Sequence, residues 1–135
     1  MSALVVWEQA GSIATITLNR PERHNSLVPE LLNDLLIALT KVADARALVL
    51  QANGRSFSTG GDVRAFYDHR DISELYAREI VGLLNLTIKG LLNFPAPTIA
   101  AVNGVVTGGS IGLVLAADIV LVTPQASFTP YYNVV

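Results

Sequence analysis

Cysteine is absent from the 135-residue sequence. Its absence excludes a structural disulfide, a thiolate nucleophile and a metal site with cysteine ligands. A chain without cysteine suits a reducing compartment, so we expect a cytoplasmic location. We also expect no signal peptide, because the first apolar stretch follows no basic residue and stops at Glu8.

Charged side chains are also scarce, at 15% of the residues, and the formal net charge is only −2. Because no basic cluster is present, we expect no nucleic acid partner. Residues 90–135 contain one charged side chain, that of Asp118. Prolines and glycines interrupt this half, so no apolar run in it is long enough to span a membrane. We interpret it as the buried part of a larger body, in a fragment of a longer enzyme; the alternative is a complete small domain with an oligomer interface.

Hydrophobic residues make up 51% of the sequence, enough for one domain with a core of its own. Ser26 is the expected N-cap of the first helix, in which Pro29 suits the first turn. The second helix is expected to bury an apolar face that runs from Leu75 to Leu92. The expected strands are 3–9, 12–19, 46–52, 98–102 and 118–122. The expected helices are a first one that follows Ser26 and has apolar residues at helical spacing from Leu31 to Val42, and two more at 72–93 and 109–117. Buried strands that alternate with helices predict an α/β fold with a parallel sheet.

Two glycine-containing turns, RSFSTGGDV and NGVVTGGSIG, each join a predicted strand to a predicted helix. Glycine allows positive φ and lets a ligand approach the backbone, and the start of a helix leaves N–H groups unpaired. Two such N–H groups aimed at one point would hold a developing oxyanion. An ordinary turn and a phosphate-binding loop are the alternatives, although neither GxGxxG nor GxxxxGK[ST] is present.

The motifs NRPERHNSL, FSTGGDV and PTIAAVNGVVTGGSIGLVLAADIVL occur in an order that resembles the enoyl-CoA hydratase/isomerase family, the crotonase superfamily. The resemblance runs through nearly the whole chain and corresponds to the N-terminal half of such a protein. It implies an α/β crotonase-like spiral of repeated ββα units, with residues 1–135 as a partial acyl-CoA-binding core domain that lacks the C-terminal part of the fold. It also implies a homotrimer or a dimer of trimers.

The resemblance further implies an acyl-CoA thioester substrate, with coenzyme A as part of it, and neither a separate cofactor nor a metal. The backbone N–H groups of Gly61 and Gly109 would polarise the thioester carbonyl as an oxyanion hole. Asp62 would fix its turn and Arg64 would face the phosphates, with a solvated surface charge as the alternative for the arginines. The residues expected to bind substrate are Arg23, Asn25, Thr59, Gly60, Gly61, Asp62, Val63, Arg64 and Tyr132.

Hydratases of this family are expected to use two glutamates, and this sequence has neither. The position three residues after the second donor glycine is Gly112, and the downstream position is Tyr132. We therefore rank a double-bond isomerase first, since it needs one carboxylate to move a proton between C2 and C4. An acyl-CoA thioester hydrolase or weak hydratase is the alternative, and a non-catalytic acyl-CoA-binding or assembly subunit is the alternative of another class. The missing acid or base is expected beyond Val135.

The other candidate side chains favour structural roles. Asp118 starts a strand, and His24 and His69 lie in polar stretches that are typical of the surface. Ser110 has no histidine near it in the sequence, so it is a weak candidate for a nucleophile. Tyr131 and Tyr132 are candidates for general acids or for the lining of an acyl pocket, and packing with a bonded hydroxyl is the commoner role of such tyrosines.

Overall fold

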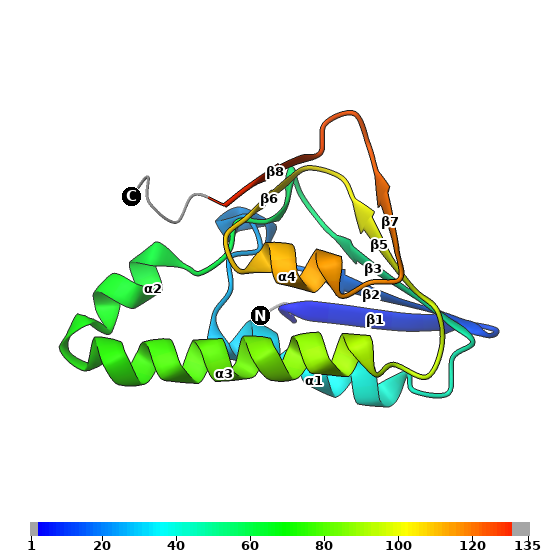
Figure 1. Ribbon diagram of the computed structural model, residues 1–135, viewed down its shortest axis with the longest axis horizontal. Helices are drawn as coiled ribbons and strands as arrows, with labels where there is room; N and C mark the ends of the chain where they lie inside the picture. The colour runs from blue at the N-terminus through cyan, green and yellow to red at the C-terminus, as the bar shows by residue number, and fades with distance from the viewer. Residues whose placement is uncertain (1–2, 131–135) are drawn as a thin grey trace.

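The computed structural model describes residues 3–130, which form two sheets with helices packed against them (Figure 1). The strands are β1 (Val5–Ala10), β2 (Ile13–Leu18), β3 (Ala47–Ala52), β4 (Ser56–Ser58), β5 (Thr98–Val102), β6 (Val105–Thr107), β7 (Ile119–Val122) and β8 (Ser127–Thr129). The large sheet has the order β1-β2-β3-β5-β7, and only the β1–β2 pair is antiparallel. The small sheet has the order β4-β6-β8 and is parallel throughout.

The helices lie between these strands in the sequence. They are α1 (Pro29–Lys41), α2 (Val63–Asp68), α3 (Ser73–Leu92) and α4 (Ser110–Leu115), with 3-10 turns at η1 (Pro21–Arg23) and η2 (Arg70–Ile72). Figure 1 shows α3 running along one side of the molecule, where it packs against α1, α2 and α4. Across residues 3–130, no helix combines the length and the apolar character needed to cross a membrane.

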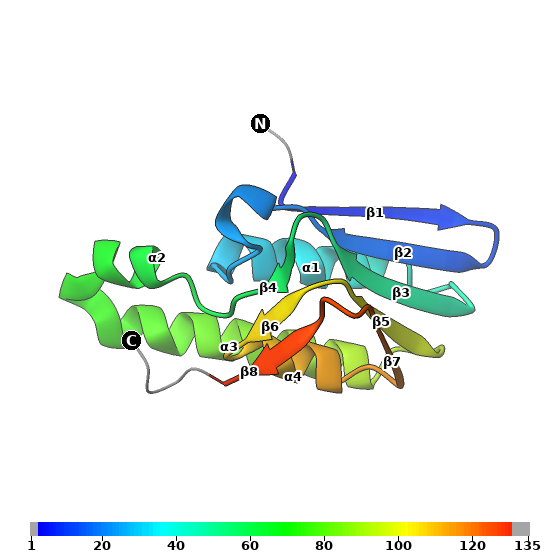
Figure 2. The ribbon, with the colours of Figure 1, turned by 90° about the horizontal axis from the view of Figure 1, so that it is seen from above.

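The chain follows the same path repeatedly. From β3 it continues into β4 and then into α2 and α3, and from β5 it continues into β6 and then α4. Each repeat adds one strand to the large sheet and one to the small sheet, as Figure 2 shows. This arrangement confirms the predicted α/β fold and the spiral of ββα units. The sequence pattern does not reveal β4, β6 or β8, because three residues are too few to show alternation.

The core lies between the large sheet and the helices that cover it. In β2, the side chains of Ala14, Ile16 and Leu18 are fully buried, whereas Ile13 is half exposed. This is the period-two alternation that the sequence predicts for a strand with one buried face. In α1, the buried face consists of Pro29, Leu31, Leu32, Leu35, Ala38 and Leu39.

The start of α1 differs from the sequence-based expectation. The residue before the helix is Val28, and no side chain caps the first turn, so the expected N-cap at Ser26 is wrong. The hydroxyl of Ser26 instead donates to the carboxylate of Asp62, at 3.1 Å. Pro29 does stand in the first turn, as expected, where its missing N–H costs the helix no hydrogen bond.

The buried face of α3 agrees with the expected one except at its ends. Ile80 and Leu91 are buried, and Leu83, Leu84 and Ile88 are partly buried against the core, as predicted. Leu75 and Leu92 are 67% and 65% exposed, so their predicted burial is wrong. The buried residues of this helix are Tyr76, Ile80, Thr87 and Leu91. The helical period and the side of the helix are correct, but the length of helix that is covered depends on the neighbouring elements α1, α2 and α4, which a single sequence does not identify.

β7 forms an edge of the large sheet, with β5 on its one paired side. Asp118, directly before β7, accepts hydrogen bonds from the Thr98 N–H (2.8 Å) and the Thr98 hydroxyl (3.2 Å). These bonds confirm the structural role predicted for Asp118. The prediction of a buried strand is wrong, however, because all four side chains of β7 are between 38% and 59% exposed.

We predict that the 135-residue chain associates in solution when it is alone. An exposed apolar edge strand pairs readily with another chain, and a lysine on such an edge prevents the pairing. Light scattering is expected to show a mass above 14.4 kDa or aggregation. Leu121→Lys, in β7, should reduce the association, whereas Leu75→Lys, on exposed α3 surface, should not. A clean monomer of the unchanged chain would contradict this prediction.

Candidate functional site

The two glycine turns lie side by side because the strands that lead into them pair. β4 and β6 are parallel, with Ser56 opposite Val105. Each strand leads into a Thr-Gly-Gly tripeptide. The first glycine of each tripeptide has a left-handed backbone, with φ +81° at Gly60 and +59° at Gly108. Other residues incur a steric penalty at such φ values, so both turns require glycine there.

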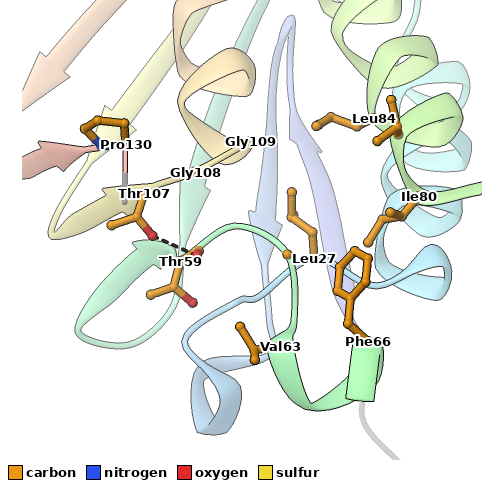
Figure 3. Close-up of a pocket in the computed structure, with 12 residues that line it drawn as sticks. Leu27, Thr59, Val63, Phe66, Ile80, Leu84, Thr107, Gly108, Gly109 and Pro130 are labelled. Atoms are coloured by element: carbon orange, nitrogen blue, oxygen red, sulfur yellow. Dashed lines mark hydrogen bonds between the residues drawn. The ribbon is translucent and has the colours of Figure 1, made fainter. Parts of the chain in front are cut away.

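Direct contacts join the two turns. A side chain at Gly60 would place its Cβ 2.8 Å from the carbonyl oxygen of Thr107 and 3.5 Å from the nitrogen of Gly109. The first distance is shorter than any normal carbon–oxygen contact, so the turns can meet only when residue 60 is glycine. The hydroxyl of Thr107 donates to the carbonyl of Thr59 at 2.7 Å, as Figure 3 shows.

The N–H group of Gly61 points away from the segment with which this turn pairs. Leu27 forms a parallel bridge with Gly61: its N–H donates to the Gly60 carbonyl (2.7 Å), and its carbonyl accepts from the Asp62 N–H (3.1 Å). Because the peptide group is planar and trans, the Gly61 N–H points opposite to the Gly60 carbonyl. Among the described residues it has no hydrogen-bond acceptor.

The N–H group of Gly109 stands at the start of α4, where the first N–H groups have no partner within the helix. Within residues 3–130, nothing accepts a hydrogen bond from it. The next residue, Ser110, is fully buried, and its hydroxyl oxygen lies 2.6 Å from the Thr107 carbonyl and 2.9 Å from the Ser58 carbonyl. Ser110 therefore fixes the start of α4 against the other turn, which confirms its structural role.

Both glycines line one cavity of about 450 Å³, a volume within the usual range of ligand sites (Figure 3). α3 supplies the wall that faces the turns, through Ile80, Val81 and Leu84. The other lining residues are Leu27, Thr59, Val63, Phe66, Thr107, Gly108 and Pro130. Two threonines are the only polar side chains in this set, and none of the described lining residues is ionisable.

A second cavity, of about 390 Å³, adjoins the first and shares Thr59, Gly61 and Val63 with it. This cavity is polar, and Arg23 and Arg64 are among the residues that line it. The rest of its lining consists of Glu22, His24, Ser26 and Asp62. A ligand with an apolar end and an anionic end, joined near Gly61, would therefore fit the two cavities together.

Asp62, directly after the donor Gly61, is 3% exposed and is held from several sides. Its carboxylate accepts from Arg20 Nη1 (2.9 Å), Arg23 Nη2 (3.0 Å), Ser26 Oγ (3.1 Å) and the Ala65 N–H (3.0 Å). The bond from Ala65 makes Asp62 the N-cap of α2. The predicted role of Asp62, to fix the turn, agrees with these contacts.

These bonds also determine the protonation state of Asp62. Burial by itself would raise the pKa of this carboxyl group. The hydrogen bonds from the Ala65 N–H, Arg20, Ser26 and Arg23 outweigh burial and lower the pKa from 3.8 to about 2. A carboxylate this acidic is a poor proton acceptor near neutral pH, so Asp62 is unsuited to act as the general base of the site.

Two of the residues predicted to bind the ligand are enclosed by protein. Asn25 is fully buried; its side chain accepts from the Arg20 N–H (2.7 Å) and donates to carbonyl oxygens in the 53–56 segment (2.8 and 3.1 Å). Gly60 is enclosed by the opposite turn. Neither residue is in the lining of the two cavities, and a ligand-binding role for them stays a prediction. Tyr132 lies outside the described residues.

The two histidines have different surroundings. His24 is exposed, as expected; it lines the polar cavity, and its Nδ1 lies 3.0 Å from the hydroxyl of Ser56. His69 is half-buried and stacks on the ring of Tyr76, with 4.3 Å between the ring centroids. The prediction of a surface position is thus only partly right for His69. In the described part of the chain, no three His, Asp or Glu side chains gather where they could hold a metal ion.

Gly112 packs α4 closely against α3. A Cβ at Gly112 would lie 2.9 Å from Ile88 Cδ1, just as a Cβ at Gly109 would lie 2.8 Å from Leu84 Cδ2. The side chain of Ile88 therefore occupies the space next to the position where the family resemblance places the first glutamate. α4 itself contains no acidic residue, so no carboxylate reaches the apolar cavity from this helix.

Arg20 is a functional residue that was not predicted from the sequence, and it is the more buried of the two arginines that bind Asp62 (17% against 34% exposed). The position of Arg20 in the NRPERHNSL motif could have indicated its role. The repetition of Thr-Gly-Gly could have indicated that the two turns pair through the hydrogen bond from Thr107 to Thr59. Phe66 lines the cavity from α2, a helix of six residues that is too short to show a clear period.

We predict that Asp62 stabilises the fold by about 2 kcal/mol at neutral pH and that acid removes this effect. Its pKa is about 2 in the folded protein and near 3.8 in the unfolded chain, so folding favours the ionised form. The stabilisation is complete above the unfolded pKa and is lost as the pH falls through the folded pKa. Urea unfolding of the wild type and of Asp62→Asn between pH 7 and pH 2 measures it. A difference in unfolding free energy that does not shrink in acid would contradict the prediction.

We predict that Gly112→Glu destabilises the protein by about 0.5–1.5 kcal/mol, because the end of the Ile88 side chain, 2.9 Å from the new Cβ, must leave its preferred rotamer. In the background of Ile88→Ala, the same substitution should cost less, because no side-chain end is left there to move. Denaturant unfolding of the two single variants and the double variant measures this coupling. Gly82→Glu, at a site on α3 where a Cβ meets nothing within 4 Å, is the control. Additive effects of the two substitutions would show that Ile88 does not limit this position.

Known proteins share this arrangement of sequence motifs. A family model described as enoyl-CoA hydratase/isomerase matches residues 8–132. A Thermus thermophilus protein named as an enoyl-CoA hydratase is 40% identical over 129 residues, which cover 90% of this chain and 49% of that protein. The 4-chlorobenzoyl coenzyme A dehalogenase-2 of an Arthrobacter species is 31% identical over 134 residues, which cover 91% of this chain and 46% of that protein.

Solved structures of proteins named for the same family have a similar fold. An enoyl-CoA hydratase/isomerase from Xanthobacter autotrophicus Py2 has a TM-score of 0.86 at 31% identity, covering 96% of this chain and 50% of that one. An enoyl-CoA hydratase from Bacillus anthracis has a TM-score of 0.84 at 29% identity, covering 93% and 49%. The chain thus spans about half the length of the relatives that it matches. Since the family model covers all but the ends of the sequence and the crotonase-like fold is the same, the chain belongs to the enoyl-CoA hydratase/isomerase family.

Proposed function

We propose that the chain binds an acyl-CoA thioester across the two adjoining cavities. The acyl group would lie in the apolar cavity, and the coenzyme A part would lie along the polar one, where Arg23 and Arg64 can pair with phosphates. The thioester would pass Gly61, which lines both cavities. The observation that carries the proposal is that Gly61 and Gly109 line one apolar cavity and that their N–H groups have no hydrogen-bond acceptor within residues 3–130.

In this proposal the two N–H groups act on the thioester carbonyl. Fixed backbone donors stabilise the negative charge that develops on the carbonyl oxygen when a proton leaves C2. Their effect is larger in an apolar cavity than in water, because the local dielectric constant is lower. The site therefore suits reactions that pass through an enolate of the thioester. We propose no cofactor beyond the coenzyme A of the substrate.

Within the family, we favour double-bond isomerisation. A base takes a proton from C2 of a 3-enoyl thioester, the electron pair moves to the carbonyl oxygen, and protonation of the dienolate at C4 leaves the 2-enoyl thioester. One group can take and return this proton, whereas hydration must also activate a water molecule. None of the described lining residues is ionisable, so isomerisation, which needs only one proton-transferring group, fits this cavity better than hydration. The base would lie outside residues 3–130.

Other functions have support of their own. The name of the Thermus thermophilus relative favours hydration, which would require acids from outside the described residues. The lack of ionisable groups among the described lining residues also suits a non-catalytic acyl-CoA-binding or assembly subunit. Thioester hydrolysis is the further alternative within the family. The proposed assembly, a trimer or a dimer of trimers, is supported by the exposed apolar side chains of β7.

We predict that the full-length protein isomerises a 3-enoyl-CoA. It should hydrate crotonyl-CoA at least about 10²-fold more slowly than a typical enzyme turnover of about 10 s⁻¹. Isomerisation raises the absorbance of the conjugated thioester, and hydration lowers it, so one spectrophotometer follows both reactions. Gly61→Val should weaken both binding and turnover, because a Cβ there lies 3.0 Å from Phe66. Gly82→Val, on the open side of α3, is the control.

The possible outcomes separate the candidate functions. Hydration at about 10 s⁻¹ would identify a hydratase and contradict the proposed isomerase. Calorimetric binding of both thioesters without either reaction would identify the non-catalytic subunit. Unchanged affinity and turnover in Gly61→Val would refute the placement of the thioester at this turn.

A further inference from the structure

The direction of the Gly61 N–H is not determined by the turn alone. Gly60 and Gly61 are consecutive, and glycine populates regions of φ and ψ that other residues avoid. The peptide group between them can therefore rotate at little steric cost. A donor that must point at one atom needs this rotation to be stopped by contacts from outside the turn.

Two hydrogen bonds with Leu27 stop the rotation. The Leu27 N–H holds the Gly60 carbonyl at 2.7 Å, and the Leu27 carbonyl holds the Asp62 N–H at 3.1 Å. The first bond fixes the plane of the peptide group that carries the Gly61 N–H. Both bonds require the segment that ends at Leu27 to stay beside the glycine turn.

The carboxylate of Asp62 fastens the two segments together. It accepts hydrogen bonds from two residues of the loop before Leu27, from Arg20 Nη1 at 2.9 Å and from Ser26 Oγ at 3.1 Å. Arg20 Nη1 also lies 3.0 Å from the carbonyl oxygen of Ser26, so loop and turn share one closed set of bonds. Because Asp62 is buried, water competes little with these bonds, which are charge-assisted and therefore strong.

We propose that Asp62 is a positioning residue, which aims the Gly61 N–H at the thioester carbonyl by fastening the glycine turn to the loop before Leu27. All the contacts of its carboxylate are internal to the protein, so it acts on the ligand through Gly61. The inference rests on the proposed acyl-CoA binding at this turn, but it does not depend on which reaction follows.

Arg23 is the less suitable partner for a test. It binds the same carboxylate through Nη2 alone, at 3.0 and 3.3 Å, and it also lines the polar cavity. A substitution of Arg23 would change ligand binding and the support of Asp62 together. Asp62 and Ser26 also border the polar cavity, but they are only 3% and 6% exposed and their polar atoms bond within the protein, so substituting them disturbs ligand contacts less.

The test measures polarisation of the bound carbonyl. A cinnamoyl-CoA with an electron-donating para substituent absorbs at longer wavelength when its thioester carbonyl accepts hydrogen bonds, and this shift needs binding but no turnover. We expect the wild type to shift the spectrum and Asp62→Asn to lose roughly half of the shift or more, with an affinity that weakens less than about threefold. Turnover should fall by about 10-fold to 100-fold, since complete removal of one oxyanion donor costs about 10²–10³-fold.

Asp118→Asn is the matched control. Asp118 is another carboxylate that accepts a backbone N–H, but it joins β5 to β7 and does not line either cavity. This variant should keep the full spectral shift. If Asp62→Asn does not fold, Ser26→Ala takes its place, because it removes one bond to the carboxylate and should reduce the shift in part.

A full spectral shift in Asp62→Asn, or in Ser26→Ala where that variant replaces it, would overturn the proposal. A wild type that binds the probe without any shift would overturn it as well. A shift that is present in the wild type and reduced in Asp62→Asn would support it, even in a protein that turns over no enoyl-CoA. If the shift is reduced in Asp62→Asn but the protein turns over no enoyl-CoA, only the proposed isomerase activity is refuted. A wild type that does not bind the probe would refute the acyl-CoA site itself.

Discussion

The missing side chain of Gly60 is the constraint on which the candidate site depends. A Cβ at this position would come within 2.8 Å of the Thr107 carbonyl, so any other residue would push the two turns apart. With the turns apart, the N–H groups of Gly61 and Gly109 would not line one cavity. The hydrogen bond from Thr107 to Thr59 fixes how the turns lie once they touch, but steric fit decides whether they touch at all.

The fold could be predicted where a strand is long enough to show its period. β2, β3 and β5 lie within one or two residues of their expected bounds, because each is a run of at least five residues with buried apolar side chains. The small sheet could not be predicted, since its strands have three residues each. Without that sheet, the sequence shows two similar turns but gives no reason for them to meet.

The backbone donors of the site could be predicted from the sequence, but the side-chain contacts that hold them in place could not. Gly61 and Gly109 are part of motifs that are continuous in the sequence. The bond between Ser26 and Asp62 joins residues 36 positions apart, and such a contact leaves no local pattern. The exposure of Leu75 has the same cause, because a helical period specifies an apolar face but not the element that covers it.

Backbone donors and side-chain acids are subject to different constraints in this family. Relatives named for hydration and for dehalogenation align with this chain over nine-tenths of its length. An N–H group is retained through almost any substitution, since proline alone lacks it, so a scaffold of glycine turns can keep its donors while its side chains change. A carboxylate at position 112 is different in this chain, because it would meet the end of the Ile88 side chain, which would have to turn aside to admit it. A catalytic group on α4 and the residue at position 88 are therefore expected to change together, so the contact between α3 and α4 bears, together with the turns, on which reactions this chain can support.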